Sequence, residues 1–91
     1  MLDADILTVL KTDLQINATA YDSYLSNLIE FSKSAIRREG ILLEDSIEDG
    51  MLVEMYAAYL YRKRRDVVVE MPRSLRYALN NRLFSQKGRA E

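Results

Sequence analysis

The chain has no cysteine, no histidine and no tryptophan, and only three glycines and one proline occur among its 91 residues. Without cysteine there can be no disulfide framework and no thiolate metal site. Without histidine, the commonest general base and the commonest metal ligand are both missing. The sequence also lacks a glycine-rich phosphate loop, metal-ligand spacing and a nucleophile motif. We therefore predict no cofactor, no metal and no enzymatic activity.

A long hydrophobic run is also missing. The longest apolar stretch, residues 51–61, has eleven residues and contains Glu54. As a helix it would be about 16 Å long, too short for a bilayer core of about 30 Å. The opening segment MLDADILTVL carries two aspartates where a secretory leader would carry lysine or arginine. We expect a soluble, cytoplasmic chain without a membrane partner.

Basic residues are scarce in the first half of the chain, and acidic residues are scarce in the second half. Residues 1–50 hold 4 Lys+Arg against 10 Asp+Glu, and residues 51–91 hold 9 against 4, so the halves carry −6 and +5. Such a dipolar chain suits head-to-tail contact between copies, or a basic face on an acidic partner. The alternative is ordinary solvated charge on both halves.

The low glycine and proline content and the abundance of helix formers predict a small all-α domain with short loops. Four helices are expected from hydrophobic periodicity and capping signals. Their approximate ranges are 3–12, 19–39, 46–65 and 72–85. Asp3 or Asp5 is expected to cap the first helix, and Leu14 and Ile16 to turn inward after it. We predict one helical domain over residues 1–85 and a flexible tail over 86–91.

The second helix has the clearest amphipathic pattern. Thr19 and Asp22 have the spacing of a capping box, with aspartate in place of the usual glutamate. Gly40 is expected to stop the helix in a left-handed conformation. Apolar residues are predicted to form a stripe about 160° wide. The stripe contains Tyr21, Tyr24, Leu25, Leu28, Ile29, Phe31, Ala35 and Ile36.

The third helix is predicted to begin at Ser46 as N-cap and is apolar nearly all the way round. It is therefore either the central helix of the bundle or partly packed on another chain. Ala57 and Ala58 would allow a neighbouring helix to approach closely. Glu54, the single charge in its apolar part, is expected to meet an arginine from another helix or to reach the surface. A role as catalytic acid is the alternative.

The fourth helix is predicted to start at or next to Pro72, whose fixed φ suits a first helical turn. Three leucines at i, i+4 and i+8 line one side: Leu75, Leu79 and Leu83. Tyr77 and Phe84 lie roughly opposite them, beside Arg73 and Asn80. Because only one apolar edge can face the parent core, the other edge is a candidate contact with a second chain.

The basic run RKRR, residues 62–65, allows three interpretations. Its cations can simply complement the C-terminal dipole of the third helix. They can instead contact another protein, or bind nucleic acid, although a sequence pI of about 5.5 disfavours a dedicated nucleic-acid binder. The valines at 67–69 that follow are either an extended loop or a strand that pairs with a neighbouring chain.

Three stretches of the sequence, in this order and spacing, have a familiar form. The first combines DIL at 5–7 with LKTDL at 10–14. The second is D-x-x-L-x-x-L-I at 22–29, followed by I-x-x-E-G at 36–40. The first suits an opening helix with its turn, and the second suits a long helix that ends in glycine.

The third stretch is Y-x-Y-R at 59–62, followed by MPRSLRYALNNR at 71–82. It gives an aromatic–arginine end to one helix and a proline-started final helix that finishes in arginine. Together the three stretches cover most of the chain. The chain resembles the head–tail connector (adaptor) proteins of long-tailed double-stranded DNA phages, which are often described as DNA-packaging proteins. Family members often begin the third helix with proline and carry a tryptophan near its end, and both are missing here.

The resemblance implies a structural protein that forms a cyclic ring of copies under the portal of a filled capsid. The ring would extend the DNA channel, through which DNA passes without specific binding, and would offer a platform for the next head-completion (stopper) protein. Its place would be the head–tail junction of the virion, after assembly in the host cytoplasm. A ring needs heterologous interfaces, in which two different faces of each copy meet.

Candidate residues for the contact with another subunit or with the portal come from the basic run and the fourth helix. They are Arg62, Arg64, Arg65, Arg73, Arg76, Tyr77, Asn80 and Phe84. The alternative function is a small nucleic-acid-binding regulatory protein that uses residues 62–65. The salt dependence of binding to random duplex DNA distinguishes the two, because phosphate contacts weaken steeply as salt rises.

Overall fold

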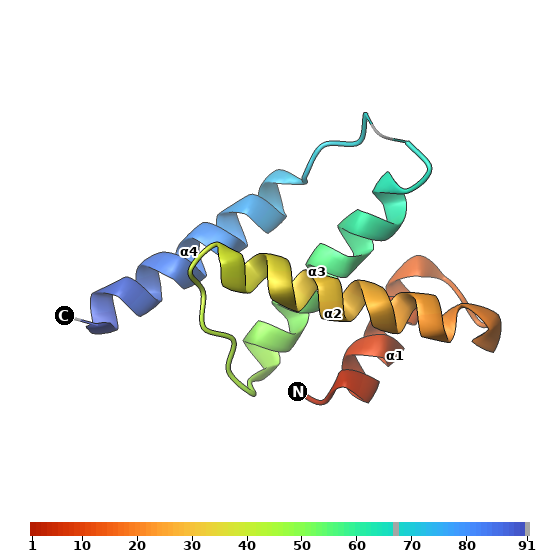
Figure 1. Ribbon diagram of the computed structural model, residues 1–91, viewed down its shortest axis with the longest axis horizontal. Coiled ribbons are helices and arrows are strands. Elements are labelled where there is room, and N and C mark those ends of the chain that lie inside the picture. The colour runs from red at the N-terminus through yellow and green to blue at the C-terminus, as the bar shows by residue number, and fades with distance from the viewer. Residues whose placement is uncertain (67, 91) are drawn as a thin grey trace.

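The structure is a computed structural model in which residues 1–66 and 68–90 are described, with side chains through residue 88. It confirms a small all-α bundle. The elements are α1 (Asp3–Leu14), a 3-10 turn η1 (Thr19–Tyr21), α2 (Asp22–Arg38), α3 (Ile47–Lys63) and α4 (Arg73–Ala90). In Figure 1, α2 crosses in front of α3 and α4 extends away from α1 towards the C-terminus. Within the described ranges, no helix is both long and apolar enough to cross a membrane.

α1 starts and ends differently from the prediction. Its N-cap is Leu2, with no side-chain capping bond, so neither Asp3 nor Asp5 caps it. Both aspartates lie in the first turn instead, where the helix dipole favours negative charge. The helix continues to Leu14 because Gln15, at φ 57°, supplies the left-handed stop, and its N–H donates to the carbonyls of Lys11 and Thr12.

The predicted capping box at the start of α2 is wrong. The chain enters α2 through η1, and neither the N-cap of η1 nor that of α2 makes a side-chain capping bond. The Asp22 carboxylate instead accepts a hydrogen bond from Lys11 Nζ at 2.7 Å, which ties α2 to α1. At the other end Gly40 has φ 98°, as predicted for a left-handed stop.

The buried stripe of α2 is narrower than predicted. Leu25, Ile29 and Ile36 belong to the core. Three aromatic residues of the predicted stripe are instead exposed. Tyr24 and Phe31 lie at one edge of the stripe, and Tyr21 lies in η1, before α2 begins. The contacts of α2 with α1 and α3 therefore leave that edge uncovered.

α3 is the central helix and packs against α1, α2 and α4. Ser46 caps it as predicted, with Oγ accepting from Asp49 N–H at 3.1 Å. Ala57 and Ala58 are buried at helix contacts, as expected. The structure thus supports the interpretation that α3 is apolar nearly all the way round because it is the central helix of the bundle.

Glu54 differs from the prediction. It neither reaches the surface nor pairs with an arginine, and within the described residues its buried Oε2 has no hydrogen-bond partner. Arg62, two turns further along the same helix, donates to Asp13 of α1 at 3.3 Å.

α4 begins directly after Pro72, as predicted, and packs Leu75 and Leu79 into the core, with Leu83 half-buried beside them. It runs five residues beyond the expected end, so residues 86–90 of the predicted tail belong to the helix, and residue 91 lies outside the described part. Gln86 explains part of this extension. Its side-chain amide bonds the backbone N–H and C=O of Leu42, in the α2–α3 loop.

The described part of the connection between α3 and α4 is a loop in which the Val69 N–H donates to the backbone carbonyl of Asp66 at 3.1 Å. Val69 is half-buried against the core and Val68 is exposed, whereas Val67 lies outside the described residues. No strand occurs in residues 1–66 or 68–90. The pinned-loop interpretation is therefore the one the fold supports.

Candidate subunit interface

The outer face of α4 is an exposed aromatic surface. Residues spaced by three, four or seven share one side of a helix, so Arg73, Tyr77, Asn81, Phe84 and Gly88 form one stripe, and all five are exposed. Tyr77 is 62% exposed and Phe84 is 66% exposed. We call this stripe the outer face of α4. The leucine edge that holds α4 to the core lies on the opposite side.

Arg76 and Asn80 lie on the flank of α4 and contact their own chain. Arg76 Nη1 and Nη2 donate to the two carboxylate oxygens of Glu39, each at 2.9 Å, and Nη1 also donates to Asn80 Oδ1 at 3.3 Å. This hydrogen-bonded pairing raises the pKa of Arg76. Arg76 thus fastens α4 to the end of α2, and a role for it between subunits stays a prediction.

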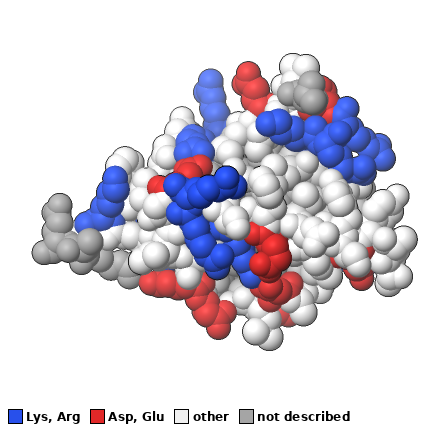
Figure 2. All heavy atoms as spheres, in the orientation of Figure 1, with Lys and Arg blue, Asp and Glu red and all other residues white. Residues whose placement is uncertain are grey.

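The basic run forms a second, separate set of candidate residues at the end of α3. Figure 2 shows basic side chains gathered over this end of the helix, at the upper right of the view. Arg62 is bonded to Asp13, and Arg64 donates to the Tyr61 hydroxyl at 2.8 Å while stacking 4.2 Å from that ring's centre. Arg65 is exposed and lines a shallow hollow with Arg62 and Tyr61. Two of the three predicted arginines therefore already have partners in this chain.

An apolar groove runs between α3 and α4, and the sequence analysis missed it. Its volume is about 310 Å³. Met51, Leu52 and Met55 line it from α3, and Ala78 lines it from α4. Glu48, Asn81 and Ser85 stand at its rim, and the Asp49–Arg82 pair closes one part of the wall. We call it the α3–α4 groove. The i, i+4, i+8 spacing of Ile47, Met51 and Met55 was the available signal for this edge of α3.

Asp49 and Arg82 form the most buried ion pair at this site. Arg82 Nε donates to Asp49 Oδ1 at 2.8 Å and Nη2 to Oδ2 at 3.1 Å, and Asp49 also accepts from the Glu44 N–H at 2.7 Å. Hydrogen bonding to Asp49 raises the pKa of Arg82. The pair fixes the position of α4 against α3 and so sets the shape of the groove.

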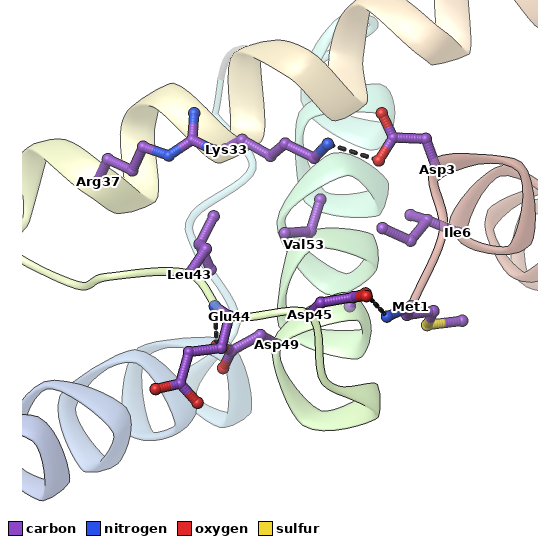
Figure 3. Close-up of a pocket in the computed structure, with 11 residues that line it drawn as sticks. Met1, Asp3, Ile6, Lys33, Arg37, Leu43, Glu44, Asp45, Asp49 and Val53 are labelled. Atoms are coloured by element: carbon purple, nitrogen blue, oxygen red, sulfur yellow. Dashed lines mark hydrogen bonds and ion pairs between the residues drawn. The ribbon is translucent and has the colours of Figure 1, made fainter.

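A smaller polar pocket of about 210 Å³ lies where the N-terminus meets the α2–α3 loop (Figure 3). Its charges are used in internal pairs: Lys33 bonds Asp3, and the N-terminal amine bonds Asp45. Met1 packs so closely on Gly50 that a β-carbon there would collide with it. This arrangement secures the start of α1. In the described part of the chain, no group of three or more acidic residues could hold a metal ion.

These surfaces combine exposed aromatic side chains, an apolar groove and arginines. The exposed aromatic residues and the apolar groove offer surface to bury, and the arginines around them are mostly held by carboxylates or tyrosines of the same chain. Comparisons with known protein families, with curated proteins and with solved structures found no match.

Proposed function

We propose that this chain is a head-completion protein of a phage or prophage, of the head–tail connector (adaptor) class. Copies of it form a ring that docks on the portal protein, extends the DNA channel and receives the next head-completion protein. DNA passes through the ring without sequence-specific contact. The ring would be part of the virion at the head–tail junction, after assembly in the host cytoplasm. The proposal rests on the resemblance of the three sequence stretches and on the surfaces described above.

The observation that carries the proposal is the exposure of Tyr77 and Phe84 on the outer face of α4. Two large aromatic side chains seven residues apart on one helix face are costly to leave in water and are typical anchors of protein interfaces. They belong to a helix whose opposite edge already supplies its contact with the core. The outer face is therefore available for another chain.

Charge supports a contact between unlike faces. Residues 1–50 carry a net charge of −6, and residues 51–91 carry +5. The acidic part includes the exposed Glu48 at the start of α3, and the basic part includes the exposed Arg73 and Lys87 on α4. Unlike faces that attract each other generate head-to-tail assemblies, which close into rings when the rotation between copies permits.

The test is to replace both aromatic residues, Tyr77→Ser and Phe84→Ser, and to measure mass by light scattering alone and with the cognate portal protein. We expect the native chain to form a ring on the portal and the double variant to lose it. Because both side chains are exposed, the fold should survive, which circular dichroism checks. A matched control replaces two exposed aromatic residues away from α4, Tyr21→Ser in η1 and Phe31→Ser in α2, and should still assemble. Unchanged assembly of the Tyr77/Phe84 variant under both conditions would refute the interface.

A further inference from the structure

We infer that the α3–α4 groove of one copy receives Tyr77 and Phe84 of a second copy of this chain. The inference deepens the proposed function, on which it rests, by naming the surface into which the exposed aromatic side chains insert. It follows from four properties of the described residues: the apolar lining of the groove, its length, the charges at its ends and the direction of the aromatic side chains.

The groove is apolar and open. Met51 and Met55 of α3 and Ala78 of α4 line it, and Met51 remains 36% exposed. Ile47, one turn before Met51, extends the apolar edge and is also exposed. Methionine side chains are flexible and polarizable, and they make favourable contacts with aromatic rings. The lining therefore suits an aromatic occupant.

The lengths of the two surfaces match. The groove runs from residue 48 to residue 55 on α3 and from residue 78 to residue 85 on α4. Tyr77 and Phe84 are also seven residues apart. At 1.5 Å per residue, each of these spans is about 10.5 Å, or two helical turns. Two aromatic rings at this separation can thus occupy both ends of one groove.

The charges at the ends are complementary. Glu48 stands exposed at the rim of the groove, at the start of α3. Arg73, on the outer face of α4, lies one turn before Tyr77, and Lys87, beside that face, lies one turn after Phe84; both are exposed. Within the described residues, none of these three side chains forms an ion pair. Because these two cations flank the Tyr77–Phe84 span on either side, one of them would lie near Glu48 in either direction of the second α4 along the groove.

A copy cannot fill its own groove with these rings. Tyr77 and Ala78 are neighbours in the sequence, so their side chains point about 100° apart around α4. Ala78 faces the groove, whereas Tyr77 faces solvent on the outer face. The ring that enters the groove must therefore come from another molecule.

The experiment uses the absence of cysteine from the natural chain. Chains of residues 1–91 carrying Met51→Cys are mixed at millimolar concentration with chains carrying Phe84→Cys or, separately, Tyr77→Cys, in a mild thiol–disulfide buffer. Mixed disulfides are measured by mass spectrometry. We expect several-fold more mixed disulfide for at least one of these pairs than for a control mixture of Ser34→Cys with the same partner, since Ser34 is exposed on α2.

A second pair of cysteine variants avoids Met51, because replacing this lining residue could itself disturb the packing of the groove. Ser85→Cys, an exposed rim position, is mixed with Tyr77→Cys and compared with the same Ser34→Cys control. Mixed disulfide at the control level for every groove pair would overturn the inference. If rings still assembled on the portal in that case, the inference alone would fail and the proposed function would stand. Efficient groove cross-linking without portal assembly would refute the proposed function and keep the inference.

Discussion

Two carboxylates buried in α3, five residues apart, have opposite surroundings. Asp49 is 2% exposed and receives two hydrogen bonds from Arg82 and one from the Glu44 backbone. Glu54 is 3% exposed, and among the described residues its Oε2 has no hydrogen-bond partner. Burial, followed by the nearby Asp13 carboxylate, raises the pKa of Glu54 to about 7, against the opposing effect of Arg62.

The comparison shows two ways of placing a carboxyl group in a thin core. At the start of α3 the group meets a fixed cation, and the pair ties α4 to the bundle. In the middle of α3 the group gains no cation and instead retains its proton to higher pH. The first arrangement stabilises a helix contact, whereas the second makes stability depend on pH near neutrality.

The largest expected effect comes from breaking the buried pair. Arg82→Ala should lower the free energy of unfolding by about 3–5 kcal/mol, because it leaves the Asp49 carboxylate buried without its cation. Urea unfolding followed by circular dichroism measures the change. The same variant should loosen α4 and thereby disturb the α3–α4 groove.

Two companion variants sharpen this result. Arg73→Ala removes an exposed arginine from the same helix and should change stability by less than about 0.5 kcal/mol. Adding Asp49→Asn to Arg82→Ala should recover part of the loss, since a neutral amide costs less to bury than an unpaired carboxylate. A loss below about 1 kcal/mol for Arg82→Ala would show that the pair behaves like an exposed one.

The second prediction concerns the pH dependence that Glu54 confers. Its pKa is about 7 in the folded chain, against 4.5 for an unperturbed glutamate. Between these values the folded state binds more protons than the unfolded state, so this contribution to stability falls as pH rises. It is complete below about pH 4.5 and is lost as pH rises through about 7.

Glu54→Gln removes this dependence, because glutamine does not titrate. We expect the variant and the native chain to unfold with similar free energies at low pH, and the variant to be more stable above pH 7 by up to about 3 kcal/mol. Urea titrations at several pH values measure the difference between the two. A difference that stays constant with pH would show that folding does not change the pKa of Glu54.

Regular periodicity made much of this molecule predictable. The spacing of Leu75 and Leu79 identified the edge of α4 that enters the core, and it left Tyr77 and Phe84 on the exposed side, as the structure has them. Local signals also sufficed where a single residue decides the backbone, as with the left-handed Gly40. Such features depend on neighbours within one or two turns, which a sequence displays directly.

Features that depend on distant partners could not be predicted. The pairing of Asp49 with Arg82 spans 33 residues and that of Glu39 with Arg76 spans 37, and many other carboxylates could have matched each arginine. The same applies to the groove, whose apolar floor exists only once α3 and α4 lie together. The extension of α4 beyond residue 85 also depends on a distant contact, through Gln86.

The smallest effect is expected at the second arginine that holds α4. Arg76 pairs with Glu39 through two bonds of 2.9 Å, yet the side chains remain 41% and 29% exposed. Arg76→Ala should therefore lower the free energy of unfolding by no more than about 1 kcal/mol.

Salt should separate the two arginines. In about 1 M salt, where the screening length is about 3 Å, the loss of stability caused by Arg76→Ala should shrink further, whereas the loss caused by Arg82→Ala should persist. Urea unfolding of both variants at low and high salt tests the contrast. Equal costs with equal salt dependence would show that burial does not determine the strength of these two pairs.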